Sequence, residues 1–302
     1  MTTHRETRDQ RLWKEELVEI PAPESDYHVS PGTLPEIRRL SLSQPLHWLR
    51  AGWSDLRRNP ALGLGFGFLI MATYGTAVAL ALSLKFYHVA LQFTAGFALM
   101  APVMALGFYE ISRRNEQNRP TRLADVLMAW NTNTDGVLGV GVVMVLLFLV
   151  WFMLSMQMAA LLLKGAGILA LLTGGGPQNF ADFAQTLVHN LSLPTTLAYL
   201  FVGLVAVAIA FAFTAVSVPL LLDRPETDAI TAIVTSWKAV TVNWAPMLLW
   251  AALIAFITGI GLAFFFVGVA LTTPLLGFAT WHAYRDTLGR WRAVKQPQVE
   301  YY

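Results

Sequence analysis

The chain contains no cysteine, which excludes disulfide bonds, thiolate metal ligands and thiol nucleophiles. Charged residues are also scarce. Only 13% of the 302 residues are Asp, Glu, Lys or Arg, whereas a soluble domain carries about a quarter. Hydrophobic residues make up 55% of the chain. This balance is typical of a protein that lies mostly in a lipid bilayer.

Motifs of catalysis and ligand binding are missing as well. The sequence has no HExxH zinc pattern, no CxxCH haem-attachment pattern and no GxSxG nucleophile elbow. The GGGP segment at 174–177 lacks the Lys-Ser/Thr that follows a phosphate-binding loop, so it is interpreted as a turn. A folded basic domain for nucleic acid is absent too. The residues therefore predict no enzyme, no metal site and no cofactor, with membrane lipid as the expected bound molecule.

Long apolar runs, by contrast, are abundant. A helix needs about 20 residues to cross a hydrocarbon core of about 30 Å. Runs of this length occupy residues 61–84, 87–108, 137–163 and 197–222. Residues 245–284 form a further, nearly uncharged block of twice that length, which we interpret as a hairpin that turns near Phe265 to Gly268. The sequence thus predicts an all-α integral membrane protein with six transmembrane helices.

An internal repeat groups these six spans into three consecutive hairpins. One tryptophan precedes each pair of spans: Trp53, Trp130 and Trp237. One proline lies in the second span of each pair: Pro102, Pro219 and Pro274. The expected repeats cover approximately residues 45–116, 123–224 and 228–288. The middle repeat carries an insert at approximately 164–196, predicted to lie outside the cytoplasm, where a re-entrant or interfacial segment is expected.

The positions of Lys and Arg predict the orientation. With the N-terminus inside, all 21 of them except Lys85 and Lys164 fall on the inner side. The N-terminus lacks a hydrophobic region, so no cleaved signal peptide is expected. We therefore expect a polar cytoplasmic arm at 1–44, a membrane domain at 45–288, a cytoplasmic tail at 289–302 and a location in the bacterial inner membrane.

Residues 45–58 predict a helix that lies in the cytoplasmic interface. Apolar side chains recur there at helical spacing and alternate with Arg and Asp. Trp48 and Trp53 are expected at headgroup depth. Each hairpin is thus expected to begin with an interfacial segment.

The stretch GFALMAPVMALGFYEISRR, residues 96–114, passes from an apolar run into dense charge. Pro102 removes a helical hydrogen bond, which is tolerated in lipid where other helices satisfy the freed carbonyl, so Pro102 is expected to face protein. Tyr109 suits the interface. Beyond it, Glu110 is placed to pair with Arg113 or Arg114, at spacings of three and four residues, in a solvated cytoplasmic anchor.

This run, with AGWSDLRRNPALGLGFG upstream and LADVLMAW downstream, resembles the DUF2189 family of predicted bacterial integral membrane proteins. The similarity is clearest over about residues 45–135 and weaker through 223–288, where PLLGFATWHAYRD echoes the same pattern. The resemblance implies a bacterial inner-membrane protein, and the family carries no assigned activity.

Histidines and glycines are the remaining candidates for function. His88 and His189 are expected on the outer side, and His47 and His282 on the inner side, so each pair is topologically compatible with haem or metal ligation. Neither pair has a diagnostic spacing, which favours interfacial or hydrogen-bonding roles.

Gly63 and Gly67 form a GxxxG pair that lets helices approach closely. Packing within the bundle is favoured over a docking face for another protein.

Two functions fit this pattern. The favoured hypothesis is a non-enzymatic accessory or scaffolding subunit of a larger membrane complex, with respiratory and photosynthetic complexes as the hosts considered. The alternative is a transporter or channel for a neutral or amphiphilic solute, because repeats and proline-kinked helices are devices of transporters.

Overall fold

The computed structural model describes residues 35–162, 179–190, 192–264 and 267–288, nearly all of them in helices. The helices are α2 (Gln44–Arg58), α3 (Pro60–Ser83), α4 (Tyr87–Met104), α5 (Leu106–Glu116), α6 (Leu123–Leu127), the 3-10 helix η1 (Ala129–Asn133), α7 (Thr134–Leu162), α9 (Phe180–Asn190), α10 (Leu193–Thr214), α11 (Ser217–Asp223), α12 (Ala229–Val242), α13 (Trp244–Ala263) and α14 (Val269–Thr287). Most of the N-terminal arm, the first half of the outer insert and the C-terminal tail lie outside the described residues.

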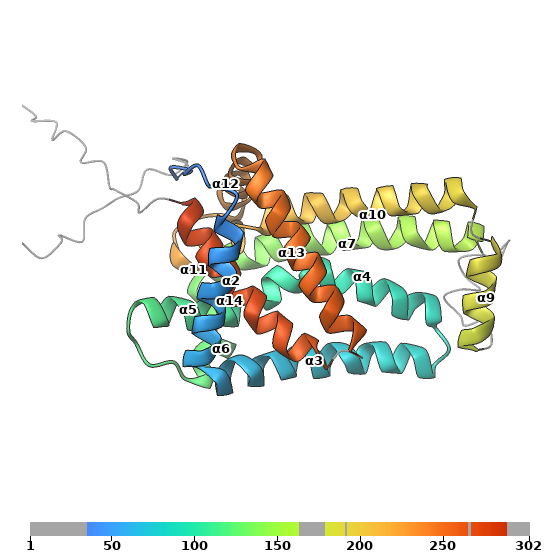
Figure 1. Ribbon diagram of the computed structural model, residues 1–302, viewed down its shortest axis with the longest axis horizontal. Helices are drawn as coiled ribbons and strands as arrows, with labels where there is room; N and C mark the ends of the chain where they lie inside the picture. Colours follow the sequence, from blue (N-terminus) through green and yellow to red (C-terminus); the bar gives the residue numbers. More distant parts are fainter. Residues whose placement is uncertain (1–34, 163–178, 191, 265–266, 289–302) are drawn as a thin grey trace, which may run out of the picture. The chain divides into compact units, whose positions relative to one another are not determined.

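The helices divide by length and position (Figure 1). The long helices α3, α4, α7 and α10 run side by side, and α13 crosses them obliquely. Short helices gather at one end. We call this region the polar end and define it as α2, α5, α6, η1, α11, α12 and the last two turns of α14. Helix α9 lies at the opposite end.

Within the described part of the chain, four helical segments are long and apolar enough to cross a membrane. They are Pro60–Ser83, Ala129–Gln157, Thr196–Asp223 and Trp244–Ala263. Helices α4 and α14 stand where the other two spans are expected, but α4 has only 18 residues and α14 contains Arg285 and Asp286. The fold is therefore an all-helical membrane protein, and the count of six crossings stays a prediction.

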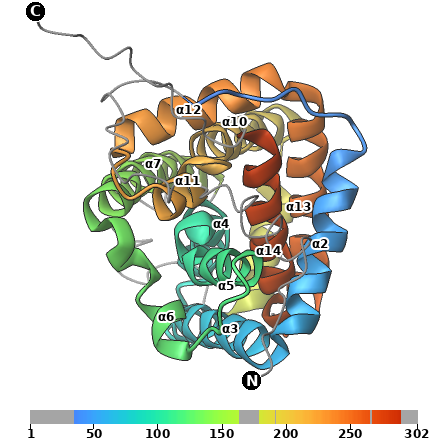
Figure 2. The same ribbon diagram turned by 90° about the vertical axis from the view of Figure 1, so that its left-hand side faces the viewer.

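The expected helix pairs are in contact: α3 with α4, α7 with α10, and α13 with α14. Helix α14 occupies a central place, because it packs against α2, α3, α5 and α13 (Figure 2). Close packing depends on glycine at Gly52, where an added Cβ would lie 2.7 Å from the backbone nitrogen of Ala279. A Cβ at Gly67 would collide with the backbone carbonyl oxygen of Ala270. Gly63 and Gly67 thus pack inside the bundle.

Two of the proline-containing segments are interrupted. Helix α4 contains Pro102 and ends at Met104, two residues before α5 begins. Helix α10 ends at Thr214, and Pro219 lies in α11 after the break. At the second break the Val216 N–H donates to the Ser236 hydroxyl at 3.1 Å, so a side chain of α12 replaces the lost helical partner.

Residues 35–43, expected as part of the polar arm, are held against the C-terminal end of α14. Ile37 and Leu288 form an antiparallel bridge, and the Arg38 N–H donates to the Thr287 carbonyl at 2.9 Å. Asn243 adds two bonds, because its side chain accepts from the Leu40 N–H at 2.8 Å and donates to the Arg38 carbonyl at 2.9 Å. The segment before α2 is therefore part of the folded unit.

Candidate functional site

A buried carboxylate, Asp55 of α2, is the centre of the polar end. Its Oδ2 accepts from the Ser112 hydroxyl at 2.6 Å and lies 2.8 Å from Nε2 of His282. Its Oδ1 accepts from the Asn115 amide at 2.9 Å, and Asn59 donates in turn to Asn115 at 2.7 Å. Asp55 thus joins α2 to α5 and α14. Together these five residues form what we call the Asp55 cluster.

The local sequence explains why these groups meet. Gly52 allows α2 to touch the backbone of α14 at Ala279. Asp55 and His282 each follow that contact by three residues, about one helical turn. The two side chains therefore project toward each other one turn beyond the closest approach of the two helices.

The Asp55 cluster favours the charged carboxylate. Burial raises the pKa of Asp55, but the hydrogen bonds with His282, Ser112 and Asn115 lower it. The hydrogen bonds outweigh burial, so the pKa lies below its usual value. Ser112 and His282 both bond to Asp55 and no bond joins them to each other. A nucleophile needs a hydrogen bond to its base, so this arrangement differs from a Ser–His–Asp triad, and it ties helices together.

Glu110 is the second buried carboxylate of the polar end. Its two oxygens accept from Arg113 at 2.8 Å and from Arg114 at 2.6 Å, so both predicted pairs are present. Arg114 also pairs with Asp125 of α6 at 3.0 Å. Glu110 is only 3% exposed. The prediction of a solvated anchor is therefore wrong for Glu110, because its own arginines and the neighbouring helices cover it.

Two further carboxylates, on α11 and α14, complete the network. Asp223 accepts from the Tyr284 hydroxyl at 2.6 Å and pairs with Arg285 at 3.2 Å. Arg285 also reaches Glu116 of α5 at 3.1 Å.

Asp286 accepts from Gln44 at 2.6 Å and from the Trp48 indole at 2.8 Å. Side-chain bonds thus join α2, α5, α11 and α14 to one another at this end.

Two aromatic residues expected at the interface are instead in the core. Tyr109 is 2% exposed and packs among apolar residues of α11 and α14. Trp48 is 1% exposed, and its ring stands edge-on to Trp250 with centroids 5.5 Å apart. Tyr109 and Trp48 both lie at the polar end, but other helices cover them. Trp53, by contrast, is 45% exposed.

The three candidate histidines with described side chains are not brought together into a ligand site. His282 is engaged by Asp55, whereas His47 on α2 and His189 on α9 are exposed. The side chain of His88 lies outside what the structure describes. Among the described residues no three His, Asp or Glu are grouped to hold a metal ion.

The candidate prolines sit at helix contacts. Pro219 and Pro274 are buried, and Pro102 is half-buried.

Of the Asp55 cluster, only His282 is a candidate in the sequence, and the other four residues were not predicted as a site. Asp55 precedes Arg57 and Arg58, so the sequence pattern resembles a solvated charged face. One signal was present, namely that Asp55 lies one turn after Gly52 on a face that also carries Trp48.

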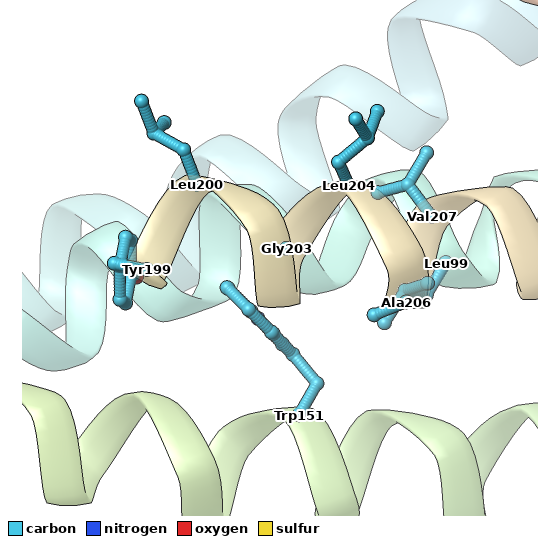
Figure 3. A pocket seen from close by; sticks show the side chains of 8 residues that line it. All are labelled: Leu99, Trp151, Tyr199, Leu200, Gly203, Leu204, Ala206 and Val207. Carbon is cyan, nitrogen blue, oxygen red and sulfur yellow. The ribbon is translucent and has the colours of Figure 1, made fainter. Parts of the chain in front are cut away.

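A separate apolar groove lies among the long helices (Figure 3). Its volume is about 380 Å³, and its lining comes from α4, α7 and α10: Leu99, Trp151, Tyr199, Leu200, Gly203, Leu204, Ala206 and Val207. Trp151 extends from α7 toward Gly203, while Leu200 and Leu204 point away from α7. The Trp151 indole nitrogen is buried and makes no hydrogen bond with the described residues.

Comparison with known proteins supports the membrane assignment. The sequence model of the DUF2189 family, described as "Predicted integral membrane protein", matches residues 89–223, from α4 to the end of α11. This match confirms the resemblance to the family over residues 89–223, whereas residues 45–88 and 224–288, where the sequence also resembles the family, lie outside it. No curated protein and no solved structure matches the chain.

Proposed function

We propose that the protein is a non-enzymatic accessory or scaffolding subunit that packs against other integral subunits of a complex in the bacterial inner membrane. The observation that supports this proposal is a set of glycines facing away from the bundle. A Cβ added at Gly65, Gly75, Gly141 or Gly259 would meet nothing within 4 Å. In lipid, glycines on an outer face let a second helix approach closely.

The proposal includes six crossings in three hairpins, with both chain ends in the cytoplasm. Helices α4 and α14 supply the two spans beyond the four apolar segments. The distribution of charge supports this orientation, since Lys85 is the one basic residue of the described ranges that lies away from the polar end. A tag fused after Tyr302 that reacts from outside intact cells would contradict the orientation.

Extraction from the native membrane in a mild detergent tests the subunit proposal. We expect partner subunits to co-purify in fixed stoichiometry, as read by mass spectrometry of the intact assembly. Gly65→Leu and Gly259→Leu, made separately, fill outward positions without a clash inside the chain, and at least one should release a partner. Phe68→Leu is the matched control, because it changes an exposed side chain of α3 without filling a glycine position. A solitary wild-type protein would overturn the proposal.

A transporter of a neutral or amphiphilic solute is the second candidate. The apolar groove beside Trp151 and the interrupted helices α4/α5 and α10/α11 favour it. Reconstitution into liposomes distinguishes the two functions. Solute movement by the purified chain, abolished by Gly203→Trp in the groove, would favour transport over the subunit role.

A further inference from the structure

Each of the three repeats carries one exposed apolar stripe on the segment before its first long helix. On α2 the stripe contains Leu46 and Trp53, which are 50% and 45% exposed. On α12 it contains Ile230, Val234 and Trp237, which are 75%, 39% and 47% exposed. In both helices an aliphatic residue stands seven positions before the tryptophan, which places the two on one helical face.

The middle repeat follows the same spacing. Leu123 and Leu127 of α6 precede Trp130 of η1 by seven and three residues, and their exposed fractions are 55%, 45% and 44%. The opposite side of this segment, with Val126 and Ala129, is buried. All three tryptophans are thus nearly half exposed at equivalent places in the repeats. We call Trp53, Trp130, Trp237 and their aliphatic partners the tryptophan collar.

The collar lies at the periphery of the polar end. Seen from that end, α2, α6 and α12 lie at the periphery, and α5, α11 and α14 lie between them (Figure 2). The inward residues of these segments pack on the bundle. The outward stripes therefore face the surroundings on separate sides of the molecule.

Basic side chains accompany the stripes. Arg50 and Arg57 flank Trp53 at spacings of three and four residues, and Lys238 follows Trp237. Arg119 precedes α6. All four are exposed, and none forms a hydrogen bond or ion pair through its side chain with another described residue. In contrast, Arg113, Arg114 and Arg285 are each paired with a carboxylate.

We propose that the tryptophan collar and its unpaired basic residues bind anionic phospholipid at headgroup level around the polar end. Tryptophan is favoured at the boundary between headgroups and hydrocarbon, and cations near the surface attract anionic lipid. An amphipathic segment in this position buries its apolar stripe among the lipids. Three such contacts on different sides fix the depth and tilt of the bundle, whether or not the protein has a partner subunit.

The depth of the collar is measured with the purified full chain in vesicles of brominated phosphatidylcholine. Bromine near the carbonyl ends of the acyl chains should quench Trp53, Trp130 and Trp237. The variant Trp53→Phe/Trp130→Phe/Trp237→Phe should therefore lose a measurable part of this quenching. Trp48, Trp250 and Trp281 are buried in both proteins, and Trp244, which is 68% exposed, accounts for quenching that remains in both. Bromine near the methyl ends should quench the variant and the wild type equally. Stronger loss with deep bromine, or no loss with either lipid, would overturn the proposal.

Selection of anionic lipid is tested by native mass spectrometry after reconstitution with equal phosphatidylglycerol and phosphatidylcholine. Each surface charge contributes about fivefold in affinity. The variant Arg50→Gln/Arg57→Gln/Lys238→Gln removes two charges at α2 and one at α12, so its affinity for phosphatidylglycerol should fall about 25-fold at α2 and about fivefold at α12, and it should retain less of this lipid than the wild type. Lys85→Gln, the same change at the opposite end, is the control and should retain the wild-type amount. Equal retention by the triple variant, or an equal loss in the control, would overturn the proposal. Thermal unfolding verifies that each variant is folded.

Discussion

At the polar end, carboxylates are buried and bound by side chains from neighbouring helices, whereas along α3, α7, α10 and α13 large apolar side chains are exposed. Asp55 is 5% exposed and has three partners on two other helices. Phe68, Leu146, Leu204 and Leu248, one from each of these four helices, are at least 57% exposed. Removing the partners of the buried carboxylates would be destabilising, and exposing the apolar side chains of the long helices to water would be unfavourable.

The difference indicates which region specifies the arrangement of the helices. Apolar side chains gain little from packing together when the surrounding lipid is equally apolar. Hydrogen bonds between specific donors and acceptors have one correct partner each, and a buried group left unpaired is destabilising. We therefore expect the polar end to fix the helix neighbours, while the long helices depend on small residues for close contact.

Asp55→Ala should give the largest effect on stability. The change leaves Ser112, Asn115 and His282 without their shared acceptor, so the free energy of unfolding should fall by about 3 kcal/mol. Unfolding in mixed micelles with increasing denaturing detergent measures the loss.

Thr73→Ala on the exposed face of α3 is the matched control for the long helices. Its hydroxyl bonds only to the Leu69 carbonyl of its own helix, and the expected change is within about 0.5 kcal/mol. Equal losses in the two variants would show that the polar end is not the specifying region.

The second prediction separates the inner and outer faces of one long helix. Gly67→Ala places a methyl group against the backbone of Ala270 and should cost about 1–3 kcal/mol. Gly65→Ala, two residues earlier, meets open space and should change the stability of the free protein by less than about 1 kcal/mol, because alanine favours the helix. The same unfolding titration compares the two variants. Similar costs would mean that α3 is not packed against α14 through Gly67.

The sequence predicted these two regions to different degrees. The four long apolar helical segments, the contacts between consecutive long helices and the prolines near the breaks follow from hydrophobic length and local chemistry, which do not depend on distant residues. The burial of Tyr109 and Glu110 does depend on distant residues, because helices far away in the sequence, among them α11 and α14, pack against α5. Periodicity places a residue at the end of a span, but it does not say whether another helix lies over it.

Asp55 illustrates the same limit at the candidate site. Its partners are 57, 60 and 227 positions away in the chain, so no local sequence motif predicts them. The charged neighbours of Asp55 in the sequence predict that its side chain is exposed to solvent. In the fold, α5 and α14 cover it instead. The tryptophan repeat was visible from spacing alone, since it needs no long-range contact.

The smallest predicted effect is a pH dependence that belongs to the polar end alone. The pKa of Asp55 in the folded protein lies below its usual value of 3.8, which is also the value expected after unfolding. The carboxylate therefore contributes stability above about pH 4, and this contribution is lost as the pH falls through the folded pKa. The contribution of Asp55 to the difference in unfolding free energy between the wild type and Asp55→Asn should not change from pH 7 to about pH 5. Below about pH 4 this difference should shrink. Exposed Asp228, whose pKa is also lowered by its bonds to Thr231, is present in both proteins and cancels in this difference. A difference that grows on acidification would mean that the Asp55 cluster favours the protonated carboxyl and that Asp55 accepts fewer hydrogen bonds than its geometry indicates.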